Sequence, residues 1–202
     1  MKILHGFIGV CVALSLCLPE LAAATSPMLV PPPNAADHMR GRKSAQVTVI
    51  VYSDLECPFC RKHDETLKTL IRRTHGKVNF VFRHFPLSFH PSARLAAIAS
   101  ECVTRDLGQG AFWSFIDEVF AQGADQYTSI AANVGLSSEK LRSCMDGPIA
   151  AATVDLDISF AGSEVTGTPA SFIYSKKKGE TSVMGAVDYQ TFYDAVSPFL
   201  KP

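Results

Sequence analysis

Two cysteines separated by two residues, Cys57-Pro58-Phe59-Cys60, lie where a predicted strand gives way to a predicted helix. The strand is the β-branched run at residues 47–52, and such an apolar run is typical of a strand covered on both faces. Pro58 suits a first helical turn, because the N–H that proline lacks would have no partner there. A further strand is expected at 78–83. The order strand, helix, strand predicts a parallel pair joined by a crossover helix.

The rest of the sequence predicts a helical block followed by a second β segment. Apolar residues recur at helical spacing between residues 91 and 162. Strands are expected at 170–174 and 182–187, joined by a turn through the lysines at 176–178. A last helix is expected after Asp188, which can cap it. The predicted fold class is therefore α/β, in the order β-α-β, helical block, β-β-α.

The first 24 residues have the three parts of a secretory signal peptide. Lys2 gives a basic start, residues 7–18 are apolar, and three alanines end at residue 24. An uncleaved membrane anchor is the alternative, although the apolar run is short for a membrane span. Residues 25–45 contain three consecutive prolines and no apolar period. We expect them to form an extended leader or linker.

Charge and cysteine content narrow the class of protein. The 202-residue chain carries 19 basic and 19 acidic side chains, which argues against a nucleic-acid-binding protein held by bulk positive charge. Six cysteines are too few for a disulfide-dense miniprotein of this length. Two of them fall in the predicted signal peptide. The other four should meet an oxidising compartment, where they allow three pairings.

The position of the cysteine pair favours redox chemistry. The first N–H groups of a helix are unpaired and the helix dipole is positive there, so a thiolate at Cys57 is stabilised. Cys60 shares a helical face with apolar residues. We therefore expect Cys60 to be the buried, resolving thiol and Cys57 the exposed nucleophile. A purely structural disulfide stays open as an alternative, and so does a metal site formed by Cys57, Cys60 and His63.

A second signal is the segment Val-Thr-Gly-Thr-Pro at residues 165–169, directly before a predicted strand. Proline cannot donate to a sheet, and a bond that precedes proline can be cis. A cis Pro169 facing Cys57 would expose the backbone of Thr168 to an extended substrate chain. Taken alone, the segment is equally compatible with a simple turn.

Together these segments resemble the DsbA-like thiol–disulfide oxidoreductases of the thioredoxin superfamily, over about residues 45–200. The matching stretches are SDLECPFCR at 53–61, FRHFPL at 82–87, HPSARLAA at 90–97 and VTGTPA at 165–170. The resemblance implies a thioredoxin fold formed by residues 46–87 and 164–202, with a helical insertion at 88–163. It also implies that Pro169 is cis.

The resemblance further implies a Cys57/Cys60 redox centre that exchanges disulfides with exported proteins. Two groups of residues would complete the site: Glu56, Pro58 and Phe59 as supporting residues, and Thr168 and Pro169 as substrate-binding residues. No cofactor and no metal are expected.

A structural disulfide between Cys102 and Cys144 is also expected, because some relatives carry a second disulfide in the helical block. Such a bridge closes a loop of about 43 residues, worth roughly 4 kcal/mol in the chain-entropy model. Two buried free thiols are the alternative.

Two departures from the family pattern affect the redox centre. Many relatives have a carboxylate six residues before the first active cysteine, where this chain has Val51. The proton-transfer role of that carboxylate is vacant here, or falls to Asp54, Glu56 or water. Phe59 replaces the histidine of the best-known strong oxidants, and a neutral ring cannot add positive charge beside the Cys57 thiolate. We therefore expect a reduced form that is less favoured than in those oxidants.

These expectations describe an exported thiol–disulfide oxidoreductase, periplasmic or secreted, that forms disulfides as a dithiol oxidase. Its partners would be exported proteins with free thiols or disulfides, and a membrane quinone-linked oxidoreductase that reoxidises it. A disulfide isomerase or reductase with the same centre is one alternative. A copper- or zinc-binding chaperone that uses Cys57, Cys60 and His63 is the alternative from a different class.

Overall fold

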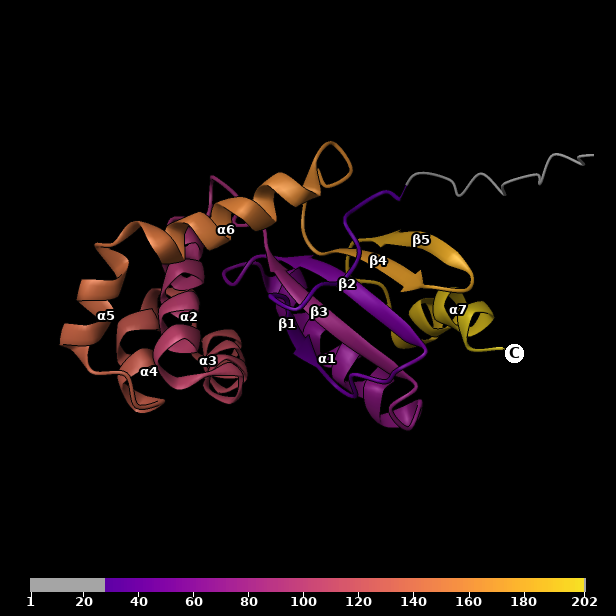
Figure 1. Ribbon diagram of the computed structural model, residues 1–202, viewed down its shortest axis with the longest axis horizontal. Helices are drawn as coiled ribbons and strands as arrows, with labels where there is room; N and C mark the ends of the chain where they lie inside the picture. Colours follow the sequence, from indigo (N-terminus) through magenta and orange to yellow (C-terminus); the bar gives the residue numbers. More distant parts are fainter. Residues whose placement is uncertain (1–27, 202) are drawn as a thin grey trace, which may run out of the picture.

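The computed structural model describes residues 28–201, so the predicted signal peptide lies outside the described residues. Its centre is a five-stranded sheet in the order β1-β3-β2-β4-β5 (Figure 1). The strands are β1 (His38–Arg40), β2 (Val47–Ser53), β3 (Val78–His84), β4 (Ala170–Ser175) and β5 (Gly179–Met184). β2 and β3 are parallel, and every other neighbouring pair is antiparallel. The parallel pair is the one predicted from the crossover pattern.

Two helices, α1 (Pro58–Arg73) and α7 (Tyr189–Leu200), pack against the sheet, and the other helices form a block beside it (Figure 1). These others are α2 (Ala93–Leu107), α3 (Gln109–Gln122), the 3-10 turn η1 (Ala124–Gln126), α4 (Tyr127–Asn133), α5 (Ser138–Met145) and α6 (Pro148–Ala161). α2 to α5 cluster together, and α6 leads from them back to the sheet. Among residues 28–201, no helix has the length and apolar character that crossing a membrane requires.

The sheet is covered on both faces, as the apolar run of β2 indicates. Alternate residues of a strand point to opposite faces. Val49 and Val51 belong to the large core that includes α1, α7 and the helical block. Ile50 and Tyr52 belong to a second core on the other face, which Val30 of the leader helps to close.

The leader was expected to be an extended segment, and the sequence did not predict that residues 38–40 of it form a strand. They form β1, which pairs antiparallel with β3 and places His38 opposite Phe82. Contacts remote in the sequence hold this strand: the Trp113 indole N–H donates to the carbonyl of Met39 at 3.2 Å. A three-residue strand carries too short a pattern for its sequence to reveal it.

A buried arginine fastens the leader to the sheet. The Arg83 side chain of β3 is fully buried and makes a bidentate ion pair with Asp37, with N–O distances of 3.0 and 3.1 Å. Its other donors reach the carbonyls of Pro31 and Pro32 and the hydroxyl of Tyr52. Every charged or polar partner of this guanidinium is thus supplied by the leader or by β2.

Smaller differences concern the ends of elements. β5 spans Gly179–Met184 rather than the predicted 182–187. The first residues of β5 are polar, so no hydrophobic pattern marks where the strand begins. Its register is set by hydrogen bonding to β4. Asp188 caps α7 as predicted, since its carboxylate accepts the backbone N–H of Thr191 at 3.0 Å.

Candidate active site

The cysteine pair lies at the junction of β2 and α1. Cys57 is the N-cap residue of α1, in an extended conformation, and Pro58 occupies the first helical turn. The carbonyl of Cys57 accepts the backbone N–H groups of Cys60 and Arg61 at 3.0 and 3.2 Å. The side chain of Cys57 therefore stands at the positive end of a sixteen-residue helix, where negative charge is favoured.

Both cysteines are free thiols, and both are largely buried. Cys57 is 5% exposed and Cys60 is 1% exposed, so Cys57 is the more accessible but not the openly exposed nucleophile expected from the sequence. It lines a surface pocket of about 310 Å³ between the start of α1 and residues 119–125 of the helical block. Residues 119–125, which cover Cys57, are distant in sequence, so the residues around Cys57 could not predict its burial.

The two thiols are strongly differentiated. A hydrogen bond from Cys60 is the largest cause that lowers the pKa of Cys57, to about 5. Burial opposes this shift, while the backbone N–H groups of Cys60 and Phe59 and the side chain of Thr168 add to it. Burial is the largest cause that raises the pKa of Cys60. Near neutral pH, Cys57 is therefore a thiolate and Cys60 a thiol.

The Thr168–Pro169 segment faces this pair. The peptide bond between the two residues is cis. Cys57 Sγ lies 3.7 Å from the carbonyl oxygen of Thr168. The buried Thr168 hydroxyl has no hydrogen-bond partner among the described residues, and its proximity lowers the pKa of both cysteines. Thr168 thus contributes to the sulfur environment through its side chain, a role that the sequence did not indicate.

The predicted supporting residues differ in their surroundings. Phe59 is 62% exposed beside the pair. Glu56 accepts the backbone N–H of Ser92 through its Oε2 atom at 2.7 Å. Asp54 is almost fully buried, and its backbone N–H donates to Cys60 Sγ at 3.4 Å.

A small cavity lies beneath Cys60. Its volume is about 10 Å³, roughly the least that holds one water molecule. Val51, Cys60, His63 and Asp64 are among the residues that line it. Burial raises the pKa of Asp64, which pairs with Lys68 at 2.6 Å. A carboxylate therefore does line the space below Cys60, although Val51 occupies the expected position.

The metal-binding alternative finds little support in the position of His63. His63 Nε2 lies 2.8 Å from Ser171 Oγ, and burial lowers the pKa of His63 to about 4. The ligand-type cluster in the described part of the chain is a different one, formed by His38, His84 and Glu101. Its members already bond to one another: His38 Nε2 and His84 Nε2 lie 2.7 and 3.0 Å from the same Glu101 oxygen.

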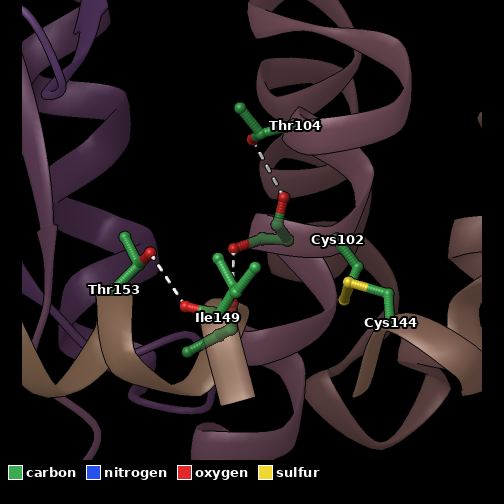
Figure 2. Close-up of a disulfide and its surroundings, with 7 residues drawn as sticks. Cys102, Thr104, Cys144, Ile149 and Thr153 are labelled. Carbon is green, nitrogen blue, oxygen red and sulfur yellow. Dashed lines mark hydrogen bonds between the residues drawn. A yellow bond between two sulfur atoms is a disulfide. The ribbon is translucent and has the colours of Figure 1, made fainter. Parts of the chain in front are cut away.

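The second cysteine pair lies in the helical block. A disulfide joins Cys102 of α2 to Cys144 of α5 (Figure 2). The two residues are 42 positions apart in sequence, and the bond ties the short α5 to the longest helix of the block. Two nearby threonine hydroxyls donate to carbonyls one turn earlier in their own helices. Thr104 of α2 donates to Ser100, and Thr153 of α6 donates to Ile149.

Comparison with protein families and curated proteins identifies relatives of this chain. A family model described as thioredoxin matches residues 34–190. The Na(+)/H(+) antiporter NhaA 3 of Salinispora tropica is 31% identical over 156 residues, which cover 74% of this chain and 23% of the antiporter. NhaA of Herminiimonas arsenicoxydans is 32% identical over 161 residues, covering 76% of this chain and 25% of that protein. The chain thus spans about a quarter of the length of these curated relatives.

Solved structures match over most of their length. DsbA2 of Pseudomonas aeruginosa has a TM-score of 0.69 at 31% identity, covering 82% of this chain and 96% of that one. α-DsbA1 of Wolbachia pipientis has a TM-score of 0.70 at 22% identity, covering 83% and 92% of the two chains. BdbD of Bacillus subtilis gives 0.69 at 24% identity, covering 82% and 94%. The predicted fold class, a thioredoxin fold with an inserted helical block, is confirmed.

Proposed function

The chain belongs to the thioredoxin family, as a DsbA-like member, and on that basis we propose that it is an exported thiol–disulfide oxidoreductase that acts as a dithiol oxidase. One observation carries the proposal: the Cys57 sulfur, at the start of α1, faces the Thr168 carbonyl that precedes the cis Pro169. This arrangement places the nucleophilic sulfur beside a backbone carbonyl acceptor. An extended substrate chain can bind to that backbone while its sulfur reaches Cys57.

The reaction is a pair of thiol–disulfide exchanges. A substrate thiolate attacks Cys57 Sγ of the oxidised enzyme, the Cys57–Cys60 bond breaks, and Cys60 leaves and takes up a proton. A second substrate thiolate then attacks the substrate sulfur of the mixed disulfide. Cys57 leaves as a thiolate, the substrate has lost two electrons, and the enzyme is reduced. A low pKa makes Cys57 a good leaving group in this last step.

Proton transfer at Cys60 has a candidate path. The raised pKa of Cys60 means that this sulfur must gain its proton early when it leaves, and lose it again on reoxidation. The small cavity below Cys60 is also lined by Asp64, whose pKa is raised by burial. A water in this cavity would connect the two groups. Asp64, rather than Asp54 or Glu56, is thus our candidate for the role that Val51 leaves vacant.

Export is supported by two features. The first 24 residues have the pattern of a signal peptide, and the Cys102–Cys144 disulfide suits an oxidising compartment. In the periplasm or outside the cell, clients would be exported proteins with free thiols. A membrane oxidoreductase would return the pair to the disulfide form.

The test compares three proteins in a dithiol-peptide oxidation assay. Wild-type protein should oxidise the peptide and Cys57→Ser should be inactive. Cys60→Ser cannot form the intramolecular disulfide, and once its Cys57 has been oxidised with glutathione disulfide it should hold the peptide in a mixed disulfide. Cys102→Ala/Cys144→Ala is the matched control, since it also removes two sulfurs but leaves the proposed centre intact. Full activity of Cys57→Ser would refute the proposal.

The direction of the chemistry needs a separate measurement. Isomerases and reductases of this fold use the same type of centre, so peptide oxidation alone does not exclude them. The thiolate character of Cys57 favours the reduced enzyme and hence oxidation of clients. We expect the equilibrium with glutathione to lie on the oxidising side of the thioredoxin range, but less far than in the strong oxidants that have a histidine in place of Phe59. An equilibrium constant in the thioredoxin range would instead support a reductase.

A further inference from the structure

The loop between β3 and α2 is bound to the two acidic residues that precede Cys57. The carboxylate of Asp54 accepts the backbone N–H groups of Glu56 and Leu87, each at 2.7 Å. Its Oδ2 atom also lies 2.8 Å from Nδ1 of His90. The loop therefore brings an imidazole to the turn on which the nucleophile is held.

These acidic residues create an electrostatic problem for a thiolate. Asp54 and Glu56 lie three and one residues before Cys57, and a carboxylate near a thiolate disfavours its negative charge. Glu56 is directed to the backbone N–H of Ser92, the N-cap residue of α2, where the helix dipole is positive. The buried Asp54 has one side-chain partner among its hydrogen bonds, and that partner is His90.

We propose that His90, when protonated, offsets the charge of Asp54 and thereby stabilises the Cys57 thiolate. The redox equilibrium of the Cys57/Cys60 pair would then depend on a histidine outside the segment that contains the pair. The inference rests on the proposed redox function of these cysteines. His90 acts through Asp54 and through its charge, so it is a positioning residue rather than a catalytic one.

The charges around His90 agree with this role. Burial alone would lower the pKa of His90, but the hydrogen bond and charge of Asp54, and then the charges of Cys57 and Glu56, raise it. Phe89, whose ring packs edge-on against the imidazole at 4.6 Å, is neutral. Coupling between two titrating groups is reciprocal. A thiolate that favours the imidazolium is therefore favoured by it to the same extent.

The coupling has a definite pH dependence. At pH values below the raised pKa of His90, the imidazolium favours the thiolate and hence the reduced enzyme. As the pH rises through that pKa, the imidazole becomes neutral and this contribution is lost. A purely structural role of His90 would not change with pH in this way.

The test uses His90→Gln, because the glutamine amide can still donate to Asp54 but carries no charge. We measure the pH dependence of alkylation at Cys57 by mass spectrometry, and the glutathione equilibrium at pH 6 and pH 9. For a charge pair screened by partial exposure, we expect a rise of about half a pH unit in the Cys57 pKa. The equilibrium should shift about threefold toward the disulfide at pH 6, and the shift should shrink at pH 9.

Two further variants make the result decisive. His75→Gln is the matched control, because it removes an exposed histidine just beyond the far end of α1 and should change neither quantity. His90→Lys keeps a positive charge at pH 9 and should hold the Cys57 pKa near its wild-type value. Equal Cys57 titration curves for wild type and His90→Gln would overturn the inference.

The outcome is separable from that of the proposed function. Alkylation of Cys57 reports its pKa whether or not the protein oxidises any client. Loss of client oxidation in the wild type, together with a shifted Cys57 pKa in His90→Gln, would contradict the function but support the His90 coupling.

Discussion

The described part of the molecule contains two cysteine pairs that are opposite in state. Cys57 and Cys60 lie three positions apart at the start of one helix and are free thiols. Cys102 and Cys144 lie 42 positions apart on two helices and form a disulfide. Burial of one sulfur does not separate the pairs, because Cys60 and Cys102 are each only 1% exposed, whereas Cys144 is partly buried.

What separates the two pairs is the stabilisation of negative charge on one sulfur. Cys57 has the N-terminus of α1, a hydrogen bond from Cys60 and the side chain of Thr168 around it. Cys102 lies within α2, between turns whose backbone groups already bond to each other. A thiolate is therefore favoured at Cys57. The comparison teaches that the reactivity of a buried cysteine depends on its hydrogen-bond donors more than on its accessibility.

Removal of the helical-block disulfide gives the largest expected effect on stability. Cys102→Ala/Cys144→Ala opens a loop of about 43 residues, and the free energy of unfolding should fall by about 4 kcal/mol. Denaturant titration of the variant and the wild type measures this difference. The alkylation rate of Cys57 should change by less than about twofold, since the two pairs share no hydrogen bond. A large loss of Cys57 reactivity would show that the pairs are not independent.

The second-largest expected effect is a pH dependence of the free energy of unfolding that only the reduced Cys57/Cys60 pair produces. The pKa of Cys57 in the folded protein, about 5, lies below the unfolded value of 9.0, so the reduced fold gains stability above pH 5 and loses it as the pH falls through 5. The raised pKa of Cys60 contributes only at alkaline pH. Relative to the oxidised protein, the reduced protein should gain roughly 2 kcal/mol of unfolding free energy between pH 5 and pH 7. Urea unfolding of both forms at the two pH values tests this, and parallel curves would contradict the low pKa.

Alkylation within a single molecule gives the smallest of the three expected effects. In a Cys102→Ala variant, Cys144 is a free thiol without the donors that surround Cys57. At pH 6, reduced Cys57 should react with iodoacetamide at least about tenfold faster than Cys144, because its larger thiolate fraction outweighs its lower intrinsic nucleophilicity. Peptide mass mapping over time measures both rates in the same sample. Equal alkylation rates would show that Cys57 is no more thiolate-like than Cys144.

Much of this arrangement follows from local sequence patterns. The β-branched run before Cys57 and the proline after it were enough to predict β2, the start of α1 and the parallel pairing with β3. Periodicity also predicted the helical block. These elements form because each buries a regular apolar face, which is a property of neighbouring residues.

The rest depends on contacts between distant segments. β1 is held by Trp113 and the edge of β3, and Arg83 holds the leader residues just before it; none of these groups is near β1 in sequence. The pocket around Cys57 is completed by residues 119–125, and His90 reaches Asp54, in the turn before Cys57, only in the folded chain. Sequence reasoning expected less stabilisation of the thiolate because Phe59 is neutral. It had no means of placing a histidine from another loop beside the same turn.

The leader also determines how this domain can be joined to other polypeptides. The backbone N–H of Leu29 donates to the carboxylate of Glu180 at 2.8 Å. Glu180 pairs with Tyr174, which pairs with Thr48 near the start of β2, whereas Cys57 follows the end of that strand. Any tether or fused domain ahead of residue 28 is therefore delivered to the end of the sheet remote from the sulfur pair.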